Sequence, residues 1–102
     1  MIRAIAIAVL LLLGSHAWAQ SVSFPSVAVG TSQAGPEVKG WVSSPPGDGP
    51  FPAIILAHSC AGVGRHTDEW AKLLVSWGYL VLIPDSFNPR GIKAVCTIPG
   101  VV

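Results

Sequence analysis

The feature that most constrains the fold is a pair of continuously apolar segments on either side of an amphipathic helix. Residues 53–57 (AIILA) and 79–83 (YLVLI) are apolar throughout and have the length of strands. Between them, Thr67-Asp68-Glu69 is typical of a helix start, because threonine caps helices and acids favour the positive end of the helix dipole. Strand, helix and strand predict a βαβ unit with a right-handed crossover between parallel strands.

The predicted helix carries one apolar stripe. Trp70, Leu73, Leu74 and Trp77 follow one another at i, i+3, i+4 and i+7, so they share one side of a helix. Gly78 stands where a left-handed C-cap falls. We expect the stripe to pack in the core rather than to form an aromatic platform for carbohydrate.

Strands that are apolar at every position need cover on both faces of their sheet. One helix covers one face, and residues 20–102 show no second strong helical pattern. The last stretch, residues 91–102, stops without completing an element. We therefore expect an α/β fold with a mostly parallel sheet and one βαβ unit, incomplete as a domain.

Residues 1–19 have the three parts of a secretory signal peptide: Arg3, the apolar run 4–13 and the small-residue end Ala17-Trp18-Ala19. A membrane span needs about 20 apolar residues, so we expect cleavage after Ala19 and no stable membrane anchor. The chain is thus predicted to be exported, to the periplasm or the medium. Its two parts are the signal peptide, 1–19, and a folded part, 20–102.

Charge and cysteine content exclude several classes of partner. The chain has six basic and five acidic residues, and this near-neutral charge gives no field that collects nucleic acid. Its two cysteines cannot close a four-thiolate zinc site, and His58, Cys60 and His66 lack an evident fourth ligand. We expect no metal and no cofactor.

From Pro52 onward the chain resembles the dienelactone-hydrolase family of α/β-hydrolases. The resemblance rests on the strand 53–57 with the loop His58-Ser59-Cys60-Ala61-Gly62, on the helix and its Trp77-Gly78-Tyr79 end, and on residues 84–91 (PDSFNPRG). The family usually has glycine where this chain has Ser59. The resemblance implies the N-terminal portion of an α/β-hydrolase domain.

The same resemblance implies an exported hydrolase that cleaves a small ester or lactone through a covalent acyl intermediate. The family's cysteine or serine nucleophile lies on a G-x-C-x-G or G-x-S-x-G elbow, and the acid and histidine follow it. None of these triad positions falls in this sequence, so we expect the 102-residue chain alone to be inactive. The family's oxyanion-hole donor maps onto the main-chain N–H of Cys60.

Other residues of these loops are candidates for the wall of the pocket. They are His58, Ser59, Asp85 and Arg90. Asp85 follows a strand, where active sites of open α/β sheets gather, but an aspartate before Ser-Phe-Asn-Pro also suits a turn. Arg90 could bind a substrate carboxylate, or be solvated or paired with Asp85. His58 could instead bond within its own loop.

Cys60 has three possible states. As a nucleophile it would need a base and a turn that leads directly into a helix, but Gly62-Val63-Gly64 intervenes. In an exported protein a disulfide with Cys96 is more plausible, with two free thiols as the alternative.

Two further functions remain open. The chain could be a catalytically inactive truncated remnant, which should bind a hydrophobic dye and fail to unfold cooperatively. It could also be a small exported binding module that uses Trp41 and the proline-rich loop 43–52, and such a module should melt as a cooperative monomer.

Overall fold

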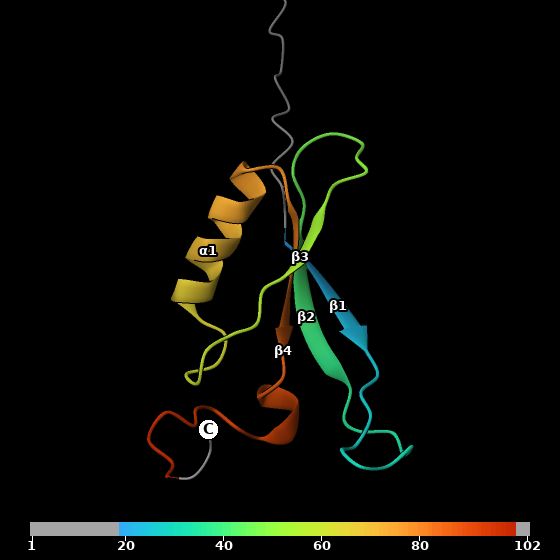
Figure 1. Cartoon of the computed structure of the whole chain (residues 1–102), viewed down its shortest axis with the longest axis vertical. Helices are drawn as coiled ribbons and strands as arrows, with labels where there is room; N and C mark the ends of the chain where they lie inside the picture. The colour runs from blue at the N-terminus through green and yellow to red at the C-terminus, as the bar shows by residue number, and fades with distance from the viewer. Residues whose placement is uncertain (1–18, 100–102) are drawn as a thin grey trace, which may run out of the picture.

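The computed structural model describes residues 19–99, which form one sheet with a helix packed against it (Figure 1). The predicted signal peptide lies outside the described residues except for Ala19. The elements are β1 (Gln20–Phe24), β2 (Val38–Ser43), β3 (Ala53–Ile55), α1 (Arg65–Ser76), β4 (Leu80–Asp85) and the short 3₁₀ helix η1 (Asn88–Arg90). No helix in this range has the length and hydrophobicity to cross a membrane.

The sheet has the order β1-β2-β4-β3, and most of its pairing is antiparallel. β1 pairs antiparallel with β2, β2 pairs antiparallel with β4, and only β3 and β4 are parallel. The expected mostly parallel sheet of an α/β-hydrolase is therefore wrong. The reason lies in the connections: a parallel pair needs a long crossover, usually a helix, and residues 19–99 contain one such helix, between β3 and β4.

The helix begins three residues earlier than the sequence suggests. Its N-cap is Gly64, which has extended backbone angles and no side chain to cap the helix. Thr67 is thus not the cap but lies in the first turn, where it is only 5% exposed. After Ser76 the chain turns at Gly78, whose φ of +93° is the left-handed conformation that favours glycine.

The core lies between α1 and the central strand β4. Val81, Ile83 and Ala71 are buried, and Trp41, Leu74 and other partly buried apolar side chains pack around them. Burial alternates along β4, as expected for a strand whose successive side chains point to opposite faces. Val81 and Ile83 therefore face the helix, while Leu80 and Leu82 face the other side and are only half-buried.

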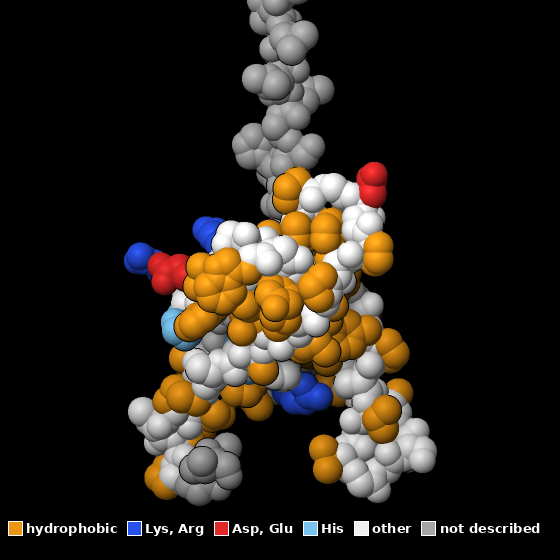
Figure 2. All heavy atoms as spheres, turned by 45° about the horizontal axis from the view of Figure 1, so that its top comes forward, with side chains coloured by type: hydrophobic (Ala, Val, Ile, Leu, Met, Phe, Trp, Pro, Cys, Tyr) orange, Lys and Arg blue, Asp and Glu red, His pale blue; other side chains and the backbone are white. Residues whose placement is uncertain are grey.

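The predicted role of the tryptophan stripe in the core is also wrong. Trp70, Leu73 and Trp77 are 43%, 40% and 61% exposed, so they face away from the sheet. The helix instead packs through Ala71 and its neighbours one turn away, because a small side chain there allows close approach to β4. Figure 2 shows hydrophobic side chains gathered across the middle of the visible surface.

Gly40 permits the close pairing of β2 with β4. A Cβ atom at this position would lie 2.9 Å from the carbonyl oxygen of Ile83 and 3.4 Å from the Cα of Pro84. Any larger residue would push the two central strands apart, and with them the strand end that carries Asp85.

Replacing Val81 by alanine should lower the free energy of unfolding by about 2 kcal/mol, because it removes methyl groups from the one fully buried large side chain. Urea denaturation followed by circular dichroism measures this. The matched control is Val29→Ala at a fully exposed position, which should change stability by less than about 0.5 kcal/mol. Equal effects of the two changes would contradict the described core.

Candidate functional site

The candidate site lies where β3 and β4 end side by side. Because the two strands are parallel, the loop after β3 and the residues after β4 meet at one edge of the sheet. His58 comes from the first and Ser86 from the second, and the Oγ of Ser86 lies 2.7 Å from Nε2 of His58. Two segments that are 28 residues apart are thus joined by a side-chain hydrogen bond.

The partners of His58 define its tautomer. Its Nδ1 lies 2.9 Å from the carbonyl oxygen of Ser59, which only accepts, so Nδ1 carries the proton. Nε2 then accepts from the Ser86 hydroxyl and from the Ser86 main-chain N–H at 3.3 Å. The ring of Phe87 packs edge-on against the imidazole at 4.4 Å between centroids. His58 is therefore fully bonded and holds the loop to the end of β4.

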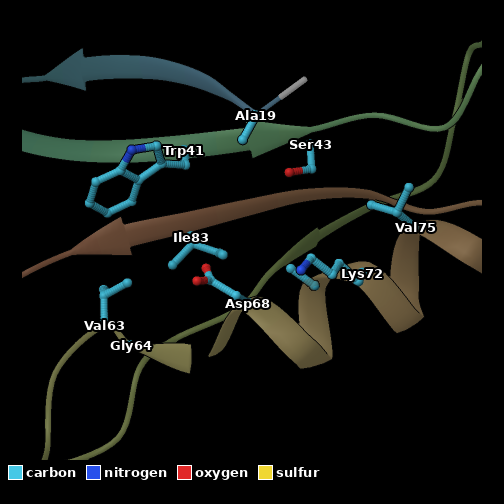
Figure 3. Close-up of a pocket in the computed structure, with 10 residues that line it drawn as sticks. Ala19, Trp41, Ser43, Val63, Gly64, Asp68, Lys72, Val75 and Ile83 are labelled. Atoms are coloured by element: carbon cyan, nitrogen blue, oxygen red, sulfur yellow. The ribbon is translucent and has the colours of Figure 1, made fainter. Parts of the chain in front are cut away.

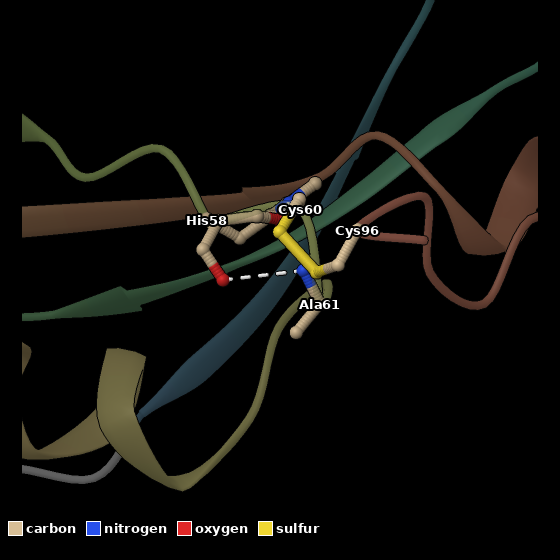
Figure 4. Close-up of a disulfide and its surroundings, with 5 residues drawn as sticks. His58, Cys60, Ala61 and Cys96 are labelled. Atoms are coloured by element: carbon tan, nitrogen blue, oxygen red, sulfur yellow. Dashed lines mark hydrogen bonds between the residues drawn. A yellow bond between two sulfur atoms is a disulfide. The ribbon is translucent and has the colours of Figure 1, made fainter. Parts of the chain in front are cut away.

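A disulfide holds the other side of the same loop (Figure 4). Cys60 is bonded to Cys96, with their Cα atoms 5.0 Å apart, so its sulfur is not available as a thiolate nucleophile. The main-chain N–H of Val95 also donates to the carbonyl of Cys60 at 2.8 Å. Gly62 allows this packing, since a Cβ there would lie 3.0 Å from the Lys93 carbonyl oxygen.

The loop leaves three main-chain donors, the N–H groups of His58, Ser59 and Cys60, without a partner among residues 19–99. Ser59 takes the N–H of Ala61 on its hydroxyl at 3.2 Å and the N–H of Gly62 on its carbonyl at 2.9 Å. The N–H of Cys60, between them, makes no hydrogen bond within the part of the chain that the structure describes. This is the N–H to which the resemblance assigns an oxyanion-hole role.

Asp85 stabilises the turn that follows β4. Its side chain is 3% exposed, and it accepts hydrogen bonds from the main-chain N–H of Phe87 and Asn88 and from the Asn88 amide. Burial by itself raises the pKa of Asp85, but the Asn88 and Phe87 N–H bonds and the nearby His58 outweigh it and leave the pKa below its usual range.

Arg90 lies apart from Asp85. Its guanidinium donates to the Ser86 carbonyl at 2.6 Å, which closes the turn after β4. Among residues 19–99 the single ion pair joins Arg65 and Glu69 on the exposed side of α1. In the same range no group of three or more histidine, cysteine or acidic side chains could hold a metal ion.

Two cavities flank the helix. The larger, about 600 Å³, lies between α1 and the sheet (Figure 3). Its lining includes the apolar side chains of Trp41, Val63, Ala71, Val75 and Ile83 and the charged residues Asp68 and Lys72. The smaller, about 230 Å³, lies beside the candidate loop. Its lining residues are Leu56, Ala57, His58, Ser59, His66, Thr67 and Trp70.

The structure thus divides the sequence-predicted residues into three groups. His58 and Ser59 line the smaller cavity, Cys60 supplies a free N–H beside them, and Asp85 and Arg90 build the adjacent turn. The sequence reasoning missed Ser86 as the partner of His58, although its place directly after an apolar strand was a usable signal. It also missed Thr67 as a cavity residue, because the residue reads as a helix cap.

No protein-family model matches this chain, and no curated protein matches it.

Reduction of the disulfide should lower the free energy of unfolding by about 3–4 kcal/mol, since the bond closes a loop of 36 residues. Denaturant unfolding with and without a phosphine reductant measures the loss. The control is the double variant Cys60→Ala with Cys96→Ala, whose stability should not respond to the reductant. An unchanged midpoint for the unaltered chain would contradict the bond.

Asp85 should make stability depend on pH in acid. Because the pKa of Asp85 is lowered in the folded state, its carboxylate stabilises the fold fully above pH 3.8, the ordinary pKa of aspartate. That stabilisation is lost as the pH falls from there through the pKa of the folded state. Asp85→Asn should lower stability at neutral pH by about 1–3 kcal/mol and remove that part of the acid dependence. Unfolding curves recorded from about pH 6 downward measure this dependence. The control is Asp48→Asn in the exposed loop, which should keep the acid dependence of the unaltered chain.

Proposed function

We propose that this chain is part of an exported hydrolase that cleaves a carboxylic ester or lactone, and that its loop 58–62 binds the carbonyl oxygen of the substrate. One observation carries the proposal: the N–H of Cys60 has no acceptor among the described residues, and it lies on an exposed loop after a parallel strand. In acyl transfer, negative charge develops on the carbonyl oxygen, and an N–H aimed at that oxygen stabilises the transition state.

The rigidity of the loop supports this role. A donor stabilises a developing charge most when it is already in place and needs no reorganisation. Here the His58–Ser86 bond fixes one side of the loop and the Cys60–Cys96 disulfide fixes the other. The Cys60 N–H between these two attachments therefore has little freedom to move.

The reaction divides into two steps. A nucleophile attacks the carbonyl carbon, the carbon–oxygen bond to the alcohol breaks, and the alcohol leaves with a proton from a general acid. Water then cleaves the acyl intermediate and releases the carboxylate. In this proposal the serine or cysteine nucleophile, the acid and the catalytic histidine belong to sequence outside these 102 residues, and no cofactor takes part.

Ser86 and His58 have the spacing of a nucleophile and its base, so their role needs a separate argument. The imidazole Nε2 already accepts from two donors of Ser86, and the Asp85 carboxylate is bonded to the turn rather than to the ring. We assign the pair to positioning the loop. The chain of 102 residues should therefore show no ester turnover above background.

The test begins with the nucleotide sequence past the Val102 codon, where a G-x-C-x-G or G-x-S-x-G elbow is expected. In the longer protein, Cys60→Pro in a Cys96→Ala background removes the N–H, whereas Cys60→Ala in that background keeps it. The proline variant should lose about 100-fold or more in kcat on a p-nitrophenyl ester relative to the alanine variant. Equal rates would exclude the N–H as a donor.

The 102-residue chain gives the complementary outcome. Ester turnover that disappears in Ser86→Ala and His58→Gln would place the catalytic pair in this chain and overturn the assignment of roles. A stop codon after Val102 together with no turnover would end the proposal of an enzyme, and the choice would then lie between an inactive remnant and a binding module.

The larger cavity favours a binding module as the second candidate. Its walls are largely apolar, and Trp41, which the sequence singles out for binding, faces into it (Figure 3). A cavity of about 600 Å³ falls in the usual range for small organic ligands. Cooperative melting of the 102-residue chain as a monomer would favour this candidate over the remnant.

A further inference from the structure

The smaller cavity contains a buried hydroxyl group that the protein itself does not use. Thr67 is 5% exposed and lines this cavity. Its hydroxyl makes no hydrogen bond to any residue between 19 and 99. In the same range, every side-chain nitrogen or oxygen atom that is fully buried has a hydrogen-bond partner. The hydroxyl oxygen therefore keeps a small accessible area, in a residue that lines this cavity.

The start of α1 adds main-chain donors at the same place. The first N–H of the helix with a main-chain partner is that of Asp68, which donates to Gly64 at 3.1 Å. Gly64 has no side chain to cap the preceding N–H groups, which belong to Arg65, His66 and Thr67. These groups and the helix dipole favour a negatively charged ligand at this end of the 12-residue helix.

The other polar groups of the cavity also suit an anion. The Ser59 hydroxyl accepts from Ala61, so its own hydrogen is free to donate. His66 lines the wall as well, and no acidic side chain does. Of the nearby acids, Glu69 is paired with Arg65 on the exposed side, and Asp68 lines the other cavity. The remaining wall is formed by His58, whose ring nitrogens are already bonded, and by the apolar side chains of Leu56, Ala57 and Trp70.

We infer that this cavity is a subsite for a small carboxylate, held by the Thr67 hydroxyl and the first N–H groups of α1, with its apolar part against Trp70. The volume of about 230 Å³ is below the usual range for drug-sized ligands and suits a small acid. The inference rests on the proposed function, since hydrolysis of an ester or lactone releases a carboxylate beside the loop that binds the carbonyl oxygen.

The test is a titration of the 102-residue chain with benzoate, followed by the amide signals of residues 65–67 in nuclear magnetic resonance spectra. Thr67→Val keeps the shape of the side chain and removes only the hydroxyl, so benzoate should bind about tenfold more weakly. Thr67→Ser keeps the hydroxyl and should bind within about threefold of the unaltered chain. Thr31→Val, in a distant exposed loop, is the matched control and should change nothing.

Two neutral or inorganic probes separate the alternatives. Benzamide, which has the size of benzoate without its charge, should not shift the same amides. Inorganic phosphate that binds as tightly as benzoate, with the same loss in Thr67→Val, would overturn the carboxylate assignment in favour of a general anion site. Benzoate binding that is absent, or equal in Thr67→Val and Thr67→Ser, would overturn the subsite altogether.

The proposed function can fail independently of the subsite. Equal ester rates for the Cys60 proline and alanine variants would remove the oxyanion role while leaving Thr67-dependent benzoate binding intact. Loss of benzoate binding with a normal effect of the proline variant would remove the subsite and leave the hydrolase proposal standing.

Discussion

The described structure depends on β4, which lies between an antiparallel and a parallel neighbour. Its side chains Val81 and Ile83 form the core with α1, and its two backbone edges pair with β2 on one side and with β3 on the other. β4 pairs with β3 as far as Leu82, and its C-terminal end pairs with β2 as far as Asp85. Asp85, the last residue of β4, and Ser86, the residue that follows it, therefore start from a fixed position.

Two attachments hold the loop after β3 to the segment that follows β4. Ser86 binds His58 directly, while the turn closed by Asp85 and Arg90 leads the chain to the segment that carries Cys96. The loop has no regular hydrogen bonding of its own beyond the contacts around Ser59. Its order is thus imposed from outside, by the hydrogen bonds between Ser86 and His58, the Val95–Cys60 hydrogen bond and the disulfide.

The sequence predicted features that depend on a few adjacent residues, and it failed for features that depend on contacts between distant segments. Continuous apolar runs and the left-handed Gly78 located the strands and the end of the helix, since both depend on a few adjacent residues. The direction of β2 could not be read from its own residues, because strand direction depends on how the chain returns. The exposed side of α1 was misjudged because its apolar residues crowd into the segment 70–75, interrupted only by Lys72, so the 3.6-residue period fits two orientations there.

The candidate chemistry follows from the one parallel pair in the sheet. A helix that joins parallel strands must start near the end of the first strand and run back along it, so its N-terminus lies beside the strand ends. That arrangement places the N–H of Cys60 and the N–H groups before Asp68 around the same loop. Donors collect there and acids do not: Asp85 is occupied by its own turn, and Asp68 faces the other cavity. Among the described residues, this edge of the sheet has unpaired N–H donors and no free carboxylate, so it favours a group that carries or develops negative charge. Both proposals use this property: one for an ester carbonyl, the other for the carboxylate that its hydrolysis releases.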